Sequence, residues 1–214
     1  VLKNLYSLLI QREITSLATL LDQRKTIRLV RLLSAQNGGL LNYSNLAREG
    51  GLSDHELRGL LNLLEKTFTI YILSPFFTNK KREVIKNPKV YFIDTGLRNA
   101  IIEDFSSLRP DKGVLYESYV FEELLKADLT FHFWRSKSKA EVDFVVKRDH
   151  SIIPIEVKAG HPQITRSFRS FIQRYQPDRA FVVNSEVRDE GKLEATLVRK
   201  VFFSEVVDLV KEIA

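Results

Sequence analysis

The first third of the chain repeats apolar residues every three or four positions, which is the spacing that amphipathic helices show. Residues 1–23 fit one or two such helices. Residues 24–35 place apolar side chains among basic ones, and Gly38 and Gly39 follow where a helix would end. The pattern therefore predicts a helical leader over residues 1–23 and, after it, the first helix of a small bundle.

Two further helices are predicted by their start and stop signals. A short helix begins at Ser44 and ends at a pair of glycines, and a longer one covers residues 54–67. Ser53 and Glu56 have the three-residue spacing of a capping box, which fixes the start of the longer helix. Two helices joined by a tight, glycine-containing turn are typical of a helix-turn-helix.

Beyond residue 67 the pattern becomes that of β-strands. The segments FTIYILSPFF and KVYFID are rich in β-branched and aromatic residues, and the stretch TNKKREVIKNP between them is polar and basic. Three helices followed by such a hairpin are the element order of a winged helix, which residues 24–98 are predicted to form.

The predicted winged helix has two places at which it would meet DNA, namely the exposed face of its third helix and the tip of its hairpin. The expected contacts are Arg58, Lys80, Lys81, Arg82 and Lys86. The same helix face also carries Asp54, Glu56 and Glu65. Because winged helices serve as protein-interaction modules too, protein binding stays open as an alternative.

From residue 99 to the C-terminus, helical and strand patterns alternate. A helix, three strands, a helix and a strand are predicted in that order, followed by a closing strand and an amphipathic helix. Such a mixture predicts an α/β sandwich around a central sheet. The expected fold class is therefore α/β, or α+β over the whole chain, with the second domain at residues 99–214.

Two predicted strands of this second domain carry charged residues among apolar ones. Asp143 lies in AEVDFVV, and Glu156 and Lys158 lie in IIPIEVKAG. A charge in so apolar a strand is costly unless a partner compensates it. Side chains two positions apart share a face of a strand, and the short connection KRDHS predicts a hairpin that brings Asp143 close to Glu156. Glu117, in the preceding helix LYESYVFEELL, is on the side that would pack on the sheet.

These residue types suit phosphate chemistry. Two converging carboxylates form the oxygen site that Mg²⁺ prefers, and an amine beside them can position water or stabilise charge on a phosphate. The expected catalytic residues are Glu117, Asp143, Glu156 and Lys158, with Asp143 and Glu156 as the metal ligands. The open alternative is an ordinary buried ion pair between Glu156 and Lys158, with Asp143 capping a partner.

Basic residues also precede the strand that holds Asp143. They are Arg135, Lys137 and Lys139. We expect these side chains to follow a phosphate backbone, although a solvated loop with no such role is an equal alternative.

The order of these motifs resembles known families. Asp followed by Glu-x-Lys on adjacent strands, after a helix with an inward Glu, is similar to the PD-(D/E)XK nuclease superfamily, the fold of restriction endonucleases. More widely, QREI, LSPFFTNKKREVIKNPKVYFIDTGL, YESYVFEELL, FWRSKSKAEVDFVV and IEVKAG resemble the C-terminal region of a family of prokaryotic, often archaeal, AAA-type ATPases. This resemblance covers nearly the whole chain.

The resemblance implies roles for the residues that match. Asp143 and Glu156 would ligate a metal, Lys158 would support catalysis, and Glu117 would add an acidic group from its helix. An ATPase domain would precede this region, and residues 1–23 would be the end of its lid. No G-x-x-x-x-G-K-[ST] motif occurs in the chain, so no ATP-binding residue is expected here and ATP would bind only to the upstream domain.

Composition narrows these expectations. The net charge of +6 and the estimated pI near 9.4 suit a DNA partner. The absence of cysteine excludes disulfides and thiolate chemistry, so that carboxylates would hold any metal. No apolar run approaches the roughly 18 residues of a membrane span and no signal-peptide pattern is present, which predicts a cytoplasmic protein without a membrane partner.

Two functions are compatible with the sequence. The first is a Mg²⁺-dependent deoxyribonuclease, guided to DNA by the winged helix and powered by an upstream ATPase domain. The second is a non-catalytic DNA- or protein-binding regulatory region that keeps the nuclease fold as a scaffold. Homo-oligomer formation is left open by the sequence.

Overall fold

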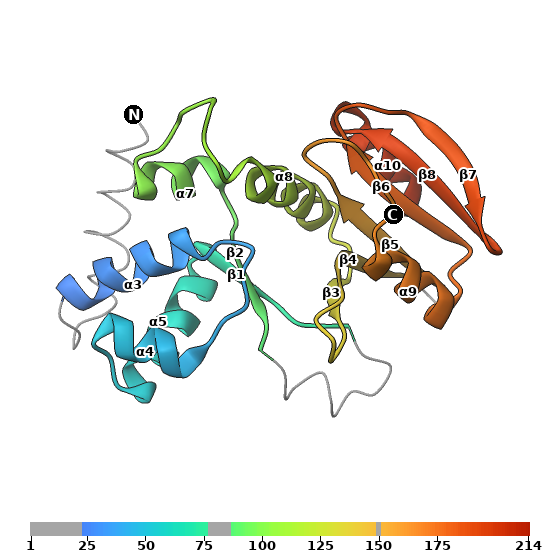
Figure 1. The fold of residues 1–214 in the computed structure, drawn as a ribbon. Helices are drawn as coiled ribbons and strands as arrows, with labels where there is room; N and C mark the ends of the chain where they lie inside the picture. The colour runs from blue at the N-terminus through green and yellow to red at the C-terminus, as the bar shows by residue number, and fades with distance from the viewer. Residues whose placement is uncertain (1–22, 77–86, 149–150) are drawn as a thin grey trace. The chain divides into compact units, whose positions relative to one another are not determined.

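Buried hydrophobic side chains gather into separate clusters, and the chain divides accordingly into two units. The structure is a computed structural model that describes residues 23–76, 87–148 and 151–214 (Figure 1). The predicted leader therefore lies almost entirely outside the described residues. Within them, the first unit holds 23–73 and 87–110, and the second holds 74–76, 111–148 and 151–214.

Helices build most of the first unit. They are α3 (Gln23–Ala35), α4 (Tyr43–Gly50), α5 (Asp54–Lys66) and α7 (Thr95–Ile102). The predicted capping box is confirmed, because Ser53 Oγ accepts the Glu56 N–H while the Glu56 carboxylate accepts the Ser53 N–H. Gly51 ends α4 with φ of +66°, a backbone conformation that glycine adopts without strain. Leucines from α3, α4 and α5 fill the core between these helices.

The strands of the predicted hairpin also pair. β1 (Ile70–Leu73) runs antiparallel to β2 (Lys89–Phe92), with Ile70 opposite Phe92. The predicted hairpin tip lies outside the described residues, and with it four of the expected DNA contacts, Lys80, Lys81, Arg82 and Lys86.

The first unit continues beyond its hairpin. Asp94 caps α7 by accepting the Leu97 N–H at 2.6 Å, and α7 packs against α3. The unit extends to Pro110, so the predicted boundary between residues 98 and 99 falls inside α7.

A six-stranded mixed sheet forms the second unit, and the predicted α/β class is confirmed. Its order is β3-β4-β5-β6-β8-β7. The strands are β3 (Phe131–Arg135), β4 (Glu141–Arg148), β5 (Ser151–Val157), β6 (Arg179–Asn184), β7 (Asp189–Leu193) and β8 (Thr196–Phe202). β3, β4 and β5 form an antiparallel meander, β6 joins β5 in parallel, and β8 joins β6 in parallel.

Helices cover both faces of this sheet (Figure 1). They are α8 (Lys112–Lys126), α9 (Arg166–Tyr175) and α10 (Val206–Ile213), the last preceded by a 3₁₀ turn, η2 (Phe203–Glu205). The ring of Phe131 contacts Phe121 of α8, whereas the ring of Trp134 contacts Phe171 of α9. Because Phe131 and Trp134 are an odd number of positions apart on β3, α8 and α9 lie on opposite faces. α10 packs beside α8.

The residues that follow β1 belong to the second unit. Phe76 donates its N–H to the Phe133 carbonyl at 2.6 Å and buries its ring against Phe171 and Tyr175. The segment FTIYILSPFF is therefore not one strand of a hairpin as predicted, since pairing with β2 ends at Leu73. In the described ranges, no helix combines the length and apolarity that crossing a membrane requires.

Candidate functional site

Asp143 lies at an irregularity of β4. The register with β3 shifts there, so that two residues of β4, Asp143 and Phe144, stand opposite one residue of β3, Phe133. Bulges of this kind bend a strand and redirect its side chains. The Asp143 carboxylate reaches the neighbouring strand, where Oδ2 accepts the Val157 N–H at 2.7 Å.

Glu156 is the buried acid of the site. It lies near the end of β5, where the ladder with β4 has ended at Ile155 but the parallel ladder with β6 continues to Val157. Only 4% of Glu156 is exposed. Lys158 follows the strand and places Nζ 2.7 Å from Glu156 Oε1, with 29% of its side chain exposed. The prediction that Glu156 and Lys158 point to the same side is confirmed.

The two oxygens of Glu156 have different surroundings. Oε1 contacts Lys158 and accepts a hydrogen bond from Thr165 Oγ1 at 3.3 Å. Oε2 is buried and has no hydrogen-bond partner among the residues that the structure describes. Burial raises the pKa of Glu156 above its usual value, although the charge and hydrogen bond of Lys158 and the hydroxyl of Thr165 act against this rise. A buried carboxylate oxygen without a donor is costly, because water no longer solvates it.

The three predicted catalytic acids, Glu117, Asp143 and Glu156, all lie near enough to Lys158 to act on it electrostatically. Glu117 on α8 contributes to raising the pKa of Glu156, and both Glu117 and Asp143 help to raise the pKa of Lys158. Burial alone would lower the pKa of Lys158, but the neighbouring acids, Glu156 above all, outweigh it. The amine is therefore held in its charged form.

The donor set of this site fits Mg²⁺. Mg²⁺ is commonly held by one or two carboxylates and keeps several water ligands, and the free Oε2 of Glu156 offers it an oxygen. Across the described ranges, no three or more ligating side chains are arranged to hold a metal ion by themselves. A metal at Asp143 and Glu156 would therefore take its remaining ligands from water or from a bound phosphate.

The described residues that were expected to contact DNA differ in their surroundings. Arg58 pairs with Asp54 at 2.8 Å and lies over the ring of Tyr43. Arg135 pairs with Glu141 at 2.7 Å. Lys137 and Lys139 are exposed on the turn between β3 and β4, directly before the strand that holds Asp143. Arg58 and Arg135 thus have carboxylate partners within the protein.

Thr165 is a residue of the site that the sequence analysis did not include. Its hydroxyl accepts the Phe168 N–H, which caps α9, and also donates to Glu156. Thr165 therefore connects the start of α9 to the buried carboxylate. Its capping role is legible in the sequence as a threonine before an amphipathic helix, but its contact with Glu156 depends on how the preceding loop folds back.

The loop after β5 is held close to the loop after β6. Ser185 Oγ donates to the Ala159 carbonyl at 3.2 Å, and His161 Nδ1 lies 3.2 Å from Glu186 Oε2. Both contacts are near Lys158 in the chain. They fix the loop that runs from Lys158 to Thr165, and so the two side chains that contact Glu156.

The sequence of this chain is similar to a known domain family and to individual proteins of other organisms. Residues 112–200 match a domain of unknown function (DUF4143), which is found in proteins associated with AAA-type ATPases, in loose agreement with the resemblance to an ATPase C-terminal region. Uncharacterized proteins of Mycobacterium tuberculosis and Mycobacterium bovis are each 28% identical over 181 residues, which cover 81% of this chain. The same region is 41% of each relative, so the chain spans about two fifths of the length of the curated relatives it matches.

A solved structure is also similar to this chain. The crystal structure of protein VC1899 from Vibrio cholerae aligns with 99% of this chain and 55% of its own at 14% identity, with a TM-score of 0.28.

The N-terminal part of the chain matches a second domain family. This match extends over residues 1–108, which are half of the sequence, and is longer than the match over residues 112–200. On that match, the chain belongs to the family of the domain of unknown function DUF8612.

Proposed function

We propose that the second unit is a Mg²⁺-dependent deoxyribonuclease domain with its metal at Asp143 and Glu156. The single observation that carries this proposal is the buried Oε2 of Glu156. Within the described ranges it has no hydrogen-bond donor, although Asp143, Glu117 and Lys158 lie around the same site. A fold does not usually retain an unsatisfied buried carboxylate oxygen unless a ligand completes it.

Each residue has a role that follows from its position. The Val157 N–H holds the Asp143 carboxylate, and Thr165 and Lys158 hold Oε1 of Glu156, so that both acids are oriented before a substrate arrives. Lys158, kept protonated by its acidic neighbours, stabilises negative charge that develops on the phosphate. Bound Mg²⁺ supplies Lewis-acid chemistry to the phosphate. Glu117 adds negative charge from α8, which strengthens the attraction for a cation.

We infer that the first unit is a winged helix that brings DNA to this domain. Its α3, α4 and α5, followed by the β1–β2 pair, have the element order of that fold, and the chain carries a net charge of +6. In a longer protein with an upstream AAA-type ATPase domain, ATP hydrolysis would drive or gate the encounter with DNA.

A non-catalytic scaffold is the second candidate, and two contacts favour it. Lys158 already neutralises Glu156, and Asp143 already satisfies the Val157 N–H, as they would in a purely structural cluster. The two candidates differ in whether the site takes up a divalent cation.

Cleavage assays separate these functions. The chain is incubated with duplex, single-stranded and branched DNA in Mg²⁺, in Mn²⁺ and in excess chelator, beside Asp143→Asn and the control Asp208→Asn, an exposed acid of α10. We expect metal-dependent cleavage that Asp143→Asn reduces by roughly 100-fold or more and Asp208→Asn leaves unchanged. Cutting that survives chelator or Asp143→Asn, or no cutting together with no Mn²⁺ binding, would overturn the nuclease proposal.

A further inference from the structure

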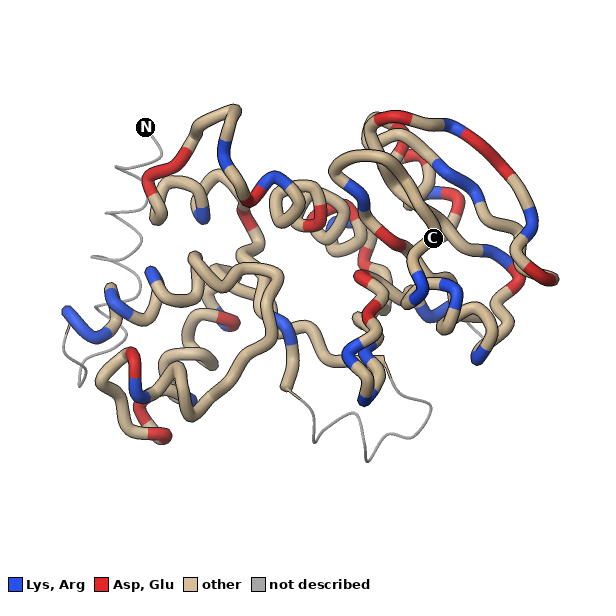
Figure 2. Tube along the Cα trace, viewed as in Figure 1, with Lys and Arg blue, Asp and Glu red and all other residues tan. Residues whose placement is uncertain are grey.

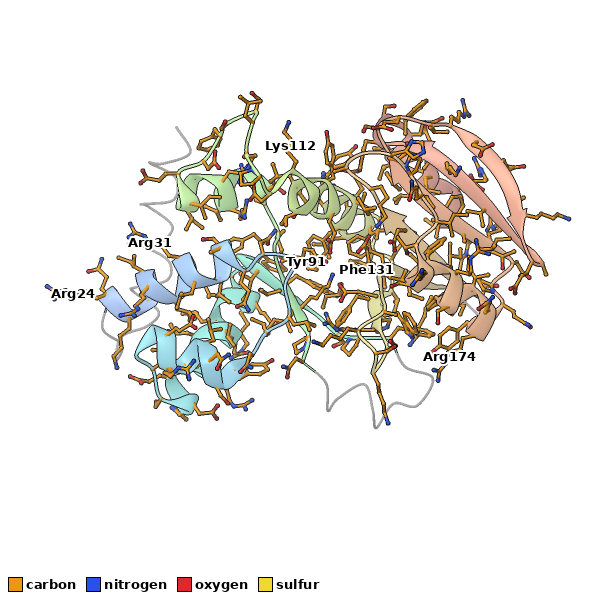
Figure 3. The ribbon with its side chains drawn as sticks, viewed as in Figure 1. Arg24, Arg31, Tyr91, Lys112, Phe131 and Arg174 are labelled. Carbon is orange, nitrogen blue, oxygen red and sulfur yellow. The ribbon has the colours of Figure 1, made fainter. Side chains whose placement is uncertain are left out.

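Helix α9 exposes a row of arginines on the outside of the second unit. Arg166, Arg169 and Arg174 are exposed. The helix contains no acidic residue, so its trace in Figure 2 has the colour of Lys and Arg but not that of Asp and Glu. Arg174 lies beside the ring of Tyr175 and points away from the sheet (Figure 3). The opposite side of α9 buries Phe168, Phe171 and Ile172 in the core, which fixes the arginines on the outer side.

Two of these arginines, Arg166 and Arg169, have no side-chain partner among the described residues, whereas Arg174 contacts only the ring of Tyr175 there. In the part of the chain that the structure describes, Arg166 and Arg169 form no ion pair and no side-chain hydrogen bond. Other arginines of the same unit do, since Arg179 and Arg199 both bind Glu212. Three like charges on a helix of ten residues repel one another, and a bound polyanion would relieve this repulsion.

The row starts next to the candidate site. Arg166 directly follows Thr165, whose hydroxyl donates to the buried carboxylate of Glu156. With a rise of about 1.5 Å per residue, Arg174 lies about 12 Å further along the helix axis. A polyanion that passed the site could therefore meet several basic groups in succession along α9.

We propose that Arg166, Arg169 and Arg174 bind the phosphate backbone of nucleic acid next to the bond that the site acts on. The proposal rests on the proposed function, since it takes DNA as the substrate of the same site. The exposed residues between the arginines are Ser170 and Gln173, which are polar. An anionic membrane is therefore the poorer match, because membrane-binding helices also present apolar side chains to the lipid.

DNA affinity of the full chain tests this surface. The variant Arg166→Glu/Arg169→Glu is compared with Arg188→Glu/Lys211→Glu, which changes the charge equally at exposed positions of the same unit. Fluorescence anisotropy with labelled duplex and single-stranded DNA, without divalent metal, is measured over a series of salt concentrations. We expect the α9 variant to bind at least about 10-fold more weakly, with a salt dependence shallower by about one unit of log–log slope for each phosphate that it no longer binds. The control should change the affinity by less than about 3-fold.

A milder variant distinguishes loss of DNA binding through loss of charge from loss through misfolding. Arg166→Gln/Arg169→Gln should lose part of the same affinity while its circular dichroism and melting temperature match those of the wild type. Equal DNA binding by wild type and α9 variants, equal loss in the control, or loss of binding to anionic vesicles but not to DNA would each overturn the proposal.

Its failure is distinguishable from failure of the proposed function. If wild-type protein neither cleaves DNA nor binds Mn²⁺, while α9 charge reversal still weakens DNA binding, the nuclease proposal falls and the α9 surface stands. If the protein cleaves DNA and α9 charge reversal leaves both affinity and cleavage unchanged, only the α9 surface falls.

Discussion

Both units bury polar side chains and pair most of them, but Glu156 of the second unit is an exception. In the first unit, Arg98 is 3% exposed and donates to the Ser34 carbonyl at 2.9 Å, and buried Asn37 accepts the Phe92 N–H at 2.7 Å. In the second unit, the equally buried Glu156 retains an oxygen, Oε2, that accepts no hydrogen bond from any of the described residues. The difference shows that burial of a polar group is not by itself a sign of function. An unsatisfied group is the more informative observation.

Two helices, α5 of the first unit and α9 of the second, also differ in how their charged side chains are paired. On α5, Arg58 pairs with Asp54, and Glu56 pairs with Lys25 of α3. On α9, Arg166 and Arg169 have no such partner in the described residues. Helix α5 thus uses these charges to hold the helices of its own unit, whereas α9 leaves the guanidinium groups of Arg166 and Arg169 available to another partner.

The largest expected effect on stability tests whether the two units have independent cores. Phe76→Ala should destabilise the second unit by about 3 to 5 kcal/mol, because a fully buried aromatic ring is lost. Trp134 is the only tryptophan and lies in the core of the second unit, so its fluorescence reports urea unfolding of that unit. In Phe76→Ala, the unfolding transition that this fluorescence reports should move to a lower urea concentration. The amides of α5, in the first unit, should keep their protection against hydrogen exchange. Equal loss of protection in α5 would contradict the division.

A smaller effect is expected when a satisfied buried group is removed from the first unit. Arg98→Met should cost about 2 to 3 kcal/mol, because the Ser34 carbonyl loses a charged donor inside the core. Hydrogen exchange of α3 and α7 measures this loss, and the Trp134 transition should not move. The matched control is Arg48→Met, an exposed arginine of α4 that contacts Asn45. Similar protection in both variants would mean that the Arg98 contacts contribute little.

The sequence predicted the elements whose signals are local. The Ser53–Glu56 capping box and the two-residue spacing of Glu156 and Lys158 need only neighbouring residues, and both were found in place. β7 was missed because its sequence, DEGKL, is polar and mostly exposed at the edge of the sheet. Phe76 was predicted to belong to the hairpin of the first unit but packs in the second, since its apolar ring fits either core by pattern alone and only packing decides.

The finer geometry of the site could not be derived in this way. The bulge at Asp143 depends on the register between β3 and β4, which the alternation of side chains does not fix when one strand holds an extra residue. The contact between Thr165 and Glu156 joins residues across a loop. Sequence spacing predicted which groups would meet but not which oxygen would be left without a donor.

Replacing the charged pair of the second unit should have the opposite sign from Arg98→Met. The double variant Glu156→Leu/Lys158→Met is expected to raise stability by roughly 1 to 2 kcal/mol, because it removes two charges from a mostly buried site together. Glu156→Leu alone should destabilise, since the half-buried amine of Lys158 loses its partner. The midpoint of urea unfolding, followed by Trp134 fluorescence, measures the stability of both variants. A double variant less stable than the wild type would show that the pair holds the fold together and would favour the scaffold function.

The smallest effect compares two glutamates whose pKa values shift in opposite directions. The Ser53 N–H and the amine of Lys25 lower the pKa of the partly exposed Glu56 from 4.5 to about 2, whereas burial raises the pKa of Glu156. Because the folded-state pKa of Glu56 is below its unfolded value, its contribution to stability is complete above pH 4.5 and is lost as the pH falls toward 2. Hydrogen exchange of α5 between pH 5 and about 2 should therefore show a decline in stability that is shallower in Glu56→Gln. Parallel pH curves for the two proteins would mean that the carboxylate of this capping box does not stabilise α5 through its charge, and would weaken the contrast with Glu156.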